Sequence, residues 1–87
     1  MRRRVEMRME HEVQLPDLGE DAPDKAEVSF WYVSEGDTVE EGQDLVEMIT
    51  DKAAFTIPSP ASGTVKQVLS REGETVKVGQ TVAVVEG

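Results

Sequence analysis

The chain has 87 residues, contains no cysteine, and carries 18 acidic against nine basic side chains, which gives a net charge of −9. This length predicts one small domain, and the lack of thiols excludes a disulfide framework and a cysteine nucleophile. The negative charge argues against nucleic acid or an anionic membrane surface as a partner. No apolar run approaches the roughly 20 residues of a membrane span.

The N-terminal segment differs in charge from the rest, since four of the nine basic residues lie within the first eight positions. Apolar and polar residues alternate from Val5 to Leu15, a pattern that fits either a long first strand or a terminal arm. No apolar stretch follows the arginines, so the segment does not match a signal peptide. We predict a disordered arm over residues 1–11 and one domain over residues 12–87.

The remainder is predicted to be all-β. Short runs rich in Val, Ile, Thr and Phe are separated by turn residues at short intervals, which is typical of small β-sandwiches and barrels. Pro58 and Pro60 interrupt strand pairing where they occur. The predicted strands are Val13–Leu15, Glu27–Val33, Thr38–Val39, Asp44–Ile49, Ala54–Ile57, Gly63–Leu69, Thr75–Val76 and Thr81–Val85.

An internal repeat organises these strands. The segment 35–43 (EGDTVEEGQ) recurs as 72–80 (EGETVKVGQ) with six of nine residues identical, at an offset of 37. Two halves with the same turns at the same spacing predict an approximate two-fold axis that relates two similar sheets packed face to face. We expect Leu45, Val46, Val65, Val82 and Val84 to supply much of the core.

Residues for independent catalysis are scarce. The single histidine, His11, lies in the predicted arm, which argues against a catalytic triad and against a zinc site. Most carboxylates fall at turns beside glycine, where they favour solubility. The neighbouring aromatic residues Phe30, Trp31 and Tyr32 lack interleaved basic residues, so we expect them to pack in the core rather than to stack on bases.

Lys52 stands out by its position. Residues Thr50–Ala53 form a predicted four-residue turn between two strands, in which Asp51 suits an inner position. A solvated turn residue is the commonest fate of a lysine. Here, however, the turn is mounted on two strands of the packed sheets, as presentation to a modifying enzyme requires.

Several short motifs occur in a characteristic order. They are Leu15–Glu20 (LPDLGE), Glu35–Asp37, Gly42–Glu47, Thr50–Ala53 (TDKA), Pro58–Pro60, Ser62–Gly63, Glu72–Val76 and Val78–Gln80. Each motif is weak alone, but in this order and spacing the chain resembles, from Val13 to Glu86, the lipoyl domains of 2-oxoacid dehydrogenase acyltransferases.

The resemblance implies a flattened barrel or sandwich of two antiparallel four-stranded sheets. It implies lipoic acid in amide linkage to Lys52, with Asp51 and Ala53 as flanking recognition residues, and no catalytic residue and no metal. The implied partners are a lipoate ligase or octanoyltransferase, a thiamine-diphosphate dehydrogenase component and dihydrolipoamide dehydrogenase. The isolated domain is expected to be monomeric, and cytoplasmic or, in a eukaryote, in the mitochondrial matrix.

Partner selection is expected close to the modified lysine. Ile49 stands where the family usually has glutamate, so this flank is more apolar than is typical. The Gly19–Lys25 loop carries Glu20, Asp21 and Asp24, and the resemblance puts it beside the turn. We therefore predict that these carboxylates, with Ile49 and Thr50, contribute to partner recognition.

Three alternatives share parts of the pattern. A biotin carboxyl carrier domain has the same architecture, but its modified lysine typically lies between two methionines, whereas Asp51 and Ala53 flank Lys52. A glycine-cleavage carrier is a longer chain with other flanking motifs. An unmodified lipoyl-like interaction module, as in secretion adaptors, has no use for Asp51 and Lys52 at the tip.

Overall fold

The computed structural model describes residues 9–87, so most of the predicted arm lies outside the described residues. These residues form eight strands and no helix, and hence no helix that could cross a membrane. The strands are β1 (Glu10–Gln14), β2 (Lys25–Trp31), β3 (Thr38–Val39), β4 (Asp44–Ile49), β5 (Ala54–Pro58), β6 (Gly63–Val68), β7 (Thr75–Lys77) and β8 (Thr81–Glu86).

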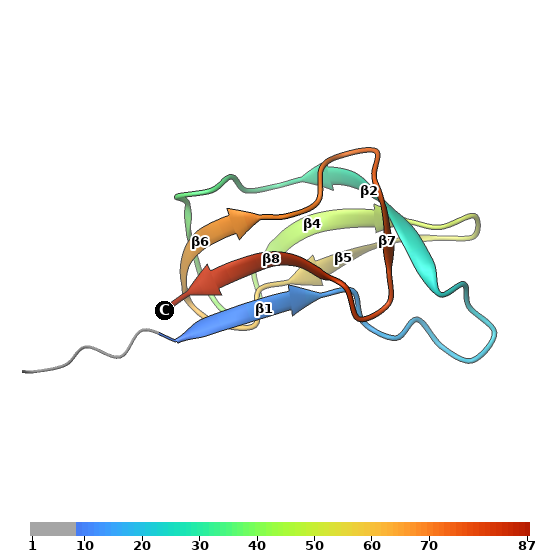
Figure 1. The fold of residues 1–87 in the computed structure, drawn as a ribbon, viewed down its shortest axis with the longest axis horizontal. Helices are drawn as coiled ribbons and strands as arrows, with labels where there is room; N and C mark the ends of the chain where they lie inside the picture. Colours follow the sequence, from blue (N-terminus) through green and yellow to red (C-terminus); the bar gives the residue numbers. More distant parts are fainter. Residues whose placement is uncertain (1–8) are drawn as a thin grey trace, which may run out of the picture.

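Two four-stranded sheets, with strand orders β1-β8-β6-β3 and β5-β4-β2-β7, pack face to face (Figure 1). All paired strands are antiparallel. The predicted all-β fold is therefore confirmed. Through residues 9–87 the two sheets remain separate ladders, so the molecule is a flattened sandwich and not a closed barrel.

The predicted two-fold axis is visible in the backbone hydrogen bonds that link the halves. The Gly36 amide donates to the Val65 carbonyl at 2.8 Å, and the Gly73 amide donates to the Val28 carbonyl at 2.8 Å. Each residue of the second bond lies 37 positions from its counterpart in the first. Both glycines have a positive φ, 95° and 92°, a backbone conformation that residues other than glycine rarely adopt. The repeated glycines are thus required by the same turn in each half.

The repeated glutamates have a matching role. The Glu35 carboxylate accepts a hydrogen bond from the Val68 amide at 2.8 Å, and the Glu72 carboxylate accepts one from the Trp31 amide at 3.1 Å. Each turn therefore holds the end of a strand in the other half. This corrects the interpretation of these two carboxylates as turn residues that serve solubility alone.

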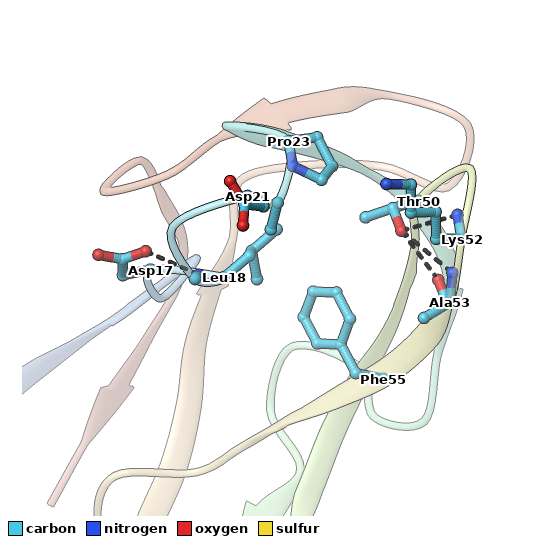
Figure 2. A pocket seen from close by; sticks show the side chains of 10 residues that line it. Asp17, Leu18, Asp21, Pro23, Thr50, Lys52, Ala53 and Phe55 are labelled. Carbon is cyan, nitrogen blue, oxygen red and sulfur yellow. Dashed lines mark hydrogen bonds between the residues drawn. The ribbon is translucent and has the colours of Figure 1, made fainter.

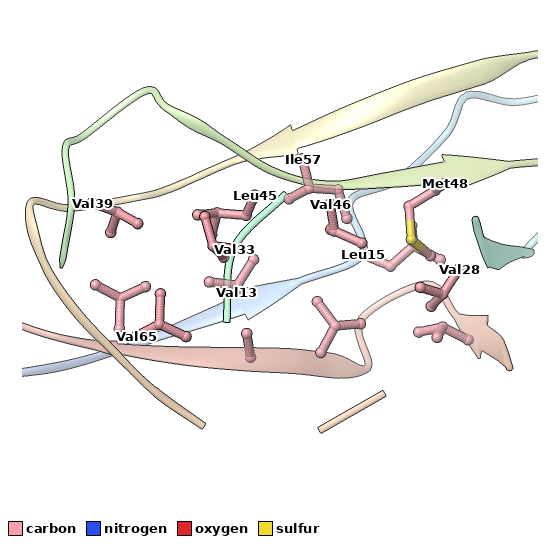
Figure 3. Close-up of a cluster of buried hydrophobic side chains, with 14 of the residues drawn as sticks. Val13, Leu15, Val28, Val33, Val39, Leu45, Val46, Met48, Ile57 and Val65 are labelled. Carbon is pink, nitrogen blue, oxygen red and sulfur yellow. The ribbon is translucent and has the colours of Figure 1, made fainter. Parts of the chain in front are cut away.

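The core lies between the sheets, and the five predicted core residues are all buried. Figure 3 shows how the side chains of both sheets meet in this layer. The fully buried residues of largest volume are Leu15, Leu45, Met48, Val28, Val39, Val46, Val65, Val76, Val82 and Val85.

The prediction for the aromatic residues is wrong for two of the three. Phe30 and Tyr32 are 50% and 49% exposed and contact each other edge to face, with ring centroids 5.2 Å apart. The pairing of β2 with β4 shifts register between Val28 and Phe30. This bulge reverses the alternation, because it turns Phe30 outward and brings Trp31 against the core. The Trp31 indole also donates to the Ser70 carbonyl at 2.8 Å.

The strand bounds agree with the prediction at β3 and β4 and differ most at the first two strands. β1 begins at Glu10, inside the segment predicted as an arm, because it pairs with β8 from Glu10 opposite Glu86 onward. The Lys66 ammonium on β6 also forms an ion pair with the Glu10 carboxylate. β2 begins at Lys25, paired with Lys77, and ends at Trp31 after the bulge.

Candidate cofactor-attachment site

Lys52 lies in the turn that connects β4 to β5. The turn closes with a backbone hydrogen bond from the Thr50 amide to the Ala53 carbonyl at 2.8 Å, and Asp51, Lys52 and Ala53 are all exposed. The hairpin projects from one end of the sandwich, whereas the start of β1 and the C-terminus lie at the other end (Figure 1). The structure thus puts Lys52 at an exposed hairpin tip, as the turn pattern predicts.

The Thr50 side chain organises this turn. Its hydroxyl oxygen accepts hydrogen bonds from the Lys52 and Ala53 amides, both at 3.2 Å, and its hydroxyl group donates to the Ala53 carbonyl at 3.3 Å (Figure 2). One side chain therefore binds the backbone on both sides of Lys52. The structure gives Thr50 a role inside the turn, in addition to the partner recognition that we predict from the sequence.

The connection between β1 and β2 packs beside the Lys52 turn. The Asp17 carboxylate accepts a hydrogen bond from the Gly19 amide at 2.9 Å, and the Ala22 amide donates to the Gly19 carbonyl at 3.3 Å. Gly19 has a φ of 115°, a conformation that favours glycine. The connection thus folds onto itself, and it lies next to the turn as the resemblance implies.

A surface groove of about 610 Å³ separates the connection from the hairpin (Figure 2). We call it the lysine groove; its lining residues are Asp17, Leu18, Gly19, Asp21, Ala22, Pro23, Thr50, Lys52, Ala53 and Phe55. The side chains of Leu18, Pro23 and Phe55 are partly buried, and Leu18 and Phe55 also pack against the core. None of these three apolar residues is predicted as a site residue from the sequence, although a leucine within an otherwise acidic loop is a signal for them.

The predicted recognition residues divide between two sides of the turn. Asp21 lines the lysine groove, whereas Glu20 and Asp24 are exposed elsewhere on the same connection. Ile49 is partly buried and lines a second groove on the other side, together with Thr50 and Asp51. Pro23 lines both grooves, so the connection reaches both flanks of the hairpin.

The titratable side chains of residues 9–87 give no candidate metal site. No three carboxylate, imidazole or thiol side chains of this region converge as metal ligands would. His11 is part of β1, and its neighbour Glu12 accepts a hydrogen bond from the Thr81 hydroxyl at 2.7 Å. The hydrogen bond to Glu10 and the negative charge of Glu10 raise the pKa of Lys66 above its ordinary value of 10.5.

The fold and the site define a small sandwich domain that displays one lysine on a rigid hairpin. Residues 11–85 match the model of the biotin/lipoyl family, described as biotin-requiring enzyme, and the chain belongs to this family.

Relatives at the sequence level are the dihydrolipoyllysine-residue acetyltransferase components of the pyruvate dehydrogenase complex of Staphylococcus aureus and Staphylococcus epidermidis. Each is 41% identical to this chain over 78 residues, which cover 90% of the chain. The match spans only 18% of the length of these relatives.

Two solved structures share the fold. The lipoyl domain of the 2-oxoglutarate dehydrogenase complex from Azotobacter vinelandii matches with a TM-score of 0.69 and 23% identity, over 85% of this chain and 92% of that domain. The urea carboxylase of Kluyveromyces lactis matches with a TM-score of 0.58 and 25% identity, over 83% of this chain and 7% of the carboxylase.

Proposed function

We propose that this chain is a lipoyl carrier domain and that the amine of Lys52 carries the lipoyl group in amide linkage. The observation that carries the proposal is the position of Lys52, exposed at the tip of a hairpin whose backbone Thr50 holds on both sides. The similarity to dihydrolipoyllysine acetyltransferases supports a lipoyl group in preference to biotin. When bound, this group supplies a disulfide ring that accepts electrons and acyl groups.

The residues of the chain fit such a group. The lysine amine is free of steric cover at the tip, and the neighbouring groove offers apolar side chains to an aliphatic chain. Thr50 fixes the backbone from which the arm projects, while Asp51 and Ala53 flank the lysine as the recognition residues for a lipoate ligase or octanoyltransferase. The contribution of the domain is therefore to present and orient the arm, and it needs no catalytic residue of its own.

Tethering explains why a carrier benefits from this arrangement. A group on a short flexible arm reaches successive active sites at a high effective concentration and does not diffuse away. The proposed partners are a thiamine-diphosphate dehydrogenase component and dihydrolipoamide dehydrogenase, in the cytoplasm or in a mitochondrial matrix. Exposed Glu20, Asp21 and Asp24 near the arm would steer a basic rim of the dehydrogenase toward Lys52.

A biotin carrier is the second candidate, since the model of the matching family is described as biotin-requiring enzyme. The residues that flank Lys52 favour the lipoyl group, because biotinyl lysines typically lie between methionines. An unmodified interaction module is a third candidate, but it does not explain why the turn is built around an exposed lysine.

Mass spectrometry of the protein from its native host tests the proposal. We expect the intact mass to show one lipoyl or octanoyl group, and peptide mapping to find it on Lys52. Lys52→Arg keeps the charge but should abolish the modification. The matched variant Lys77→Arg, in β7, should still carry the full modification on Lys52. Biotin on Lys52, or a lipoyl group on the Lys52→Arg variant, would contradict the proposal.

A further inference from the structure

The lysine groove is not needed for attachment of a group to Lys52, because the amine already projects at the hairpin tip. Its volume of about 610 Å³ lies within the range of about 300–1,000 Å³ that is usual for small-molecule sites. Its three largest apolar side chains come from two segments, Leu18 and Pro23 from the connection and Phe55 from β5. The groove therefore has the size and the apolar lining of a binding site.

We propose that the lysine groove is a resting site for the arm carried by Lys52, in which the apolar chain and disulfide ring of the lipoyl group pack against Leu18, Pro23 and Phe55. This inference rests on the proposed function, since it requires that Lys52 be lipoylated. The arm then alternates between a docked state, shielded from water, and an extended state that reaches partner active sites.

The occupant follows from the position of Lys52 itself. Lys52 lines the groove, so any group on its amine is tethered at the edge of the site. Because the arm is short and attached at the groove, its binding is an intramolecular step with an effective concentration in roughly the millimolar range. Even weak apolar contacts then suffice to populate the docked state, whereas a free ligand of the same affinity would not bind.

The asymmetry of the two halves also points to this site. Ten residues (15–24) connect β1 to β2, whereas four residues (59–62) make the equivalent connection between β5 and β6. The longer connection supplies Leu18, Ala22 and Pro23, which form one wall of the groove. The two-fold repeat is therefore interrupted by extra residues at the end of the molecule that carries the lysine, and those residues line the groove opposite the hairpin.

The polar groups at the edge of the groove allow a neutral guest. The Asp17 carboxylate accepts a hydrogen bond from the Gly19 amide, and the Thr50 hydroxyl accepts one from the Lys52 amide within the turn. Asp21 is the remaining carboxylate of the lining. A lipoyl group in amide linkage carries no charge, so it can pack on the apolar wall without an ion partner.

Nuclear magnetic resonance of the whole chain tests the inference. The chain is prepared unmodified, octanoylated and lipoylated, and the modification of each sample is established by intact mass. In the lipoylated sample we expect nuclear Overhauser cross-peaks between arm protons and the Phe55 ring and Leu18 methyl groups. We also expect chemical-shift changes at these residues relative to the unmodified chain. The octanoylated sample reports whether the aliphatic chain suffices or the disulfide ring is required.

Two variants separate docking from attachment and from folding. Ala22→Asp adds a charge to the groove wall without removing core volume, and should abolish the cross-peaks while lipoylation proceeds to the same extent. The control is Phe30→Ala, which removes an exposed ring that lines none of the grooves beside Lys52, and should leave the cross-peaks unchanged.

The possible failures are distinguishable. A sample that the ligase does not modify, as judged by mass, overturns the proposed function and this inference with it. A lipoylated sample without cross-peaks or shift changes in the groove overturns the inference alone. Shift changes at Leu18 and Phe55 that appear only when a dehydrogenase is added, with or without the arm, would assign the groove to a partner and also overturn it.

Discussion

Thr50 and Gly87 occupy equivalent positions in the two halves of the molecule. The Thr50 amide donates to the Ala53 carbonyl at 2.8 Å across the lysine turn, and the Gly87 amide donates to the Met9 carbonyl at 3.0 Å. The lysine turn at one end of the sandwich is thus the structural counterpart of the meeting point of residues 9 and 87 at the other. Residues 9 and 87 therefore lie at the end of the domain opposite Lys52.

The Thr50 hydroxyl should matter more for modification than for stability. Thr50→Val removes three hydrogen bonds in an exposed turn, which we expect to lower the free energy of unfolding by only about 1 kcal/mol. The Lys52 backbone should become mobile, so the rate of lipoylation, followed by mass spectrometry, should fall. Thr50→Ser keeps the hydroxyl and should retain most of the rate. Equal rates in Thr50→Val and the wild-type chain would show that the turn needs no such bond.

The packing at Leu45 should dominate the stability of this small domain. Leu45 is fully buried, and Leu→Ala truncation in a core typically costs about 2–5 kcal/mol. A domain of this size is stable by roughly 4–13 kcal/mol, so Leu45→Ala should shift the denaturant midpoint strongly. Leu69→Ala, at a residue 50% exposed, is the matched control and should change stability by less than about 0.5 kcal/mol. Similar midpoints for the two variants would place the core elsewhere.

The glutamates that join the halves should stabilise the fold measurably. Glu72→Ala removes the acceptor of the Trp31 amide and Glu35→Ala that of the Val68 amide. We expect each to lower the free energy of unfolding by about 1–2 kcal/mol, because each bond has a charged acceptor and is partly exposed. Urea denaturation is the measurement. Glu20→Ala, on the exposed connection, should have almost no effect, and an equal effect there would contradict the assigned role.

Negative charge on the β1–β2 connection should increase the rate of reductive acylation by the dehydrogenase and should not change lipoylation by the ligase. Glu20→Gln combined with Asp21→Asn should slow reductive acylation of the lipoylated chain by its dehydrogenase, most clearly at low salt, where screening is weak. Glu40→Gln with Glu41→Gln changes the charge equally in the turn that packs on Ser62. Acylation kinetics that are the same for both pairs would remove the connection from the recognition surface, and a loss of lipoylation would make the effect indirect.

The ion pair at Lys66 should give a weak alkaline dependence of stability. The hydrogen bond and charge of Glu10, with a further contribution from Glu86, raise the pKa of Lys66 in the folded state. Its stabilising effect is therefore fully present below pH 10.5, the ordinary pKa of lysine, and is lost as pH rises through the raised value. The difference in melting temperature between the wild-type chain and Lys66→Gln should shrink toward zero above that pH. A difference that persists there would have a cause other than charge.

The sequence was informative where a residue pattern maps directly onto backbone geometry. The repeat at an offset of 37 predicts the two-fold, because Gly36 and Gly73 each require a positive φ at the same turn. The turn Thr50–Ala53 predicts an exposed lysine because two strands flank it. Such local requirements are written into short stretches of sequence, so no knowledge of the packing is needed to find them.

Features that depend on distant partners were not predictable in the same way. The bulge in β2 that exposes Phe30 and Tyr32 is set by pairing with β4, and the start of β1 is set by pairing with β8. The lysine groove exists because the fold brings the β1–β2 connection opposite Phe55, which lies far along the chain. The roles of Glu35 and Glu72 likewise require knowing which strand end of the other half lies above each turn.

The unequal lengths of the β1–β2 and β5–β6 connections make the two ends of the domain different, although the sheets are related by an approximate two-fold axis. If the two ends had the same shape apart from Lys52, a partner could not distinguish them by their connections. Here one end carries the ten-residue connection, and the other has a short link and Gly63, where the carbonyl of Glu86 leaves no room for a side chain. The domain therefore has two distinguishable ends, and Lys52 lies at the end with the longer connection.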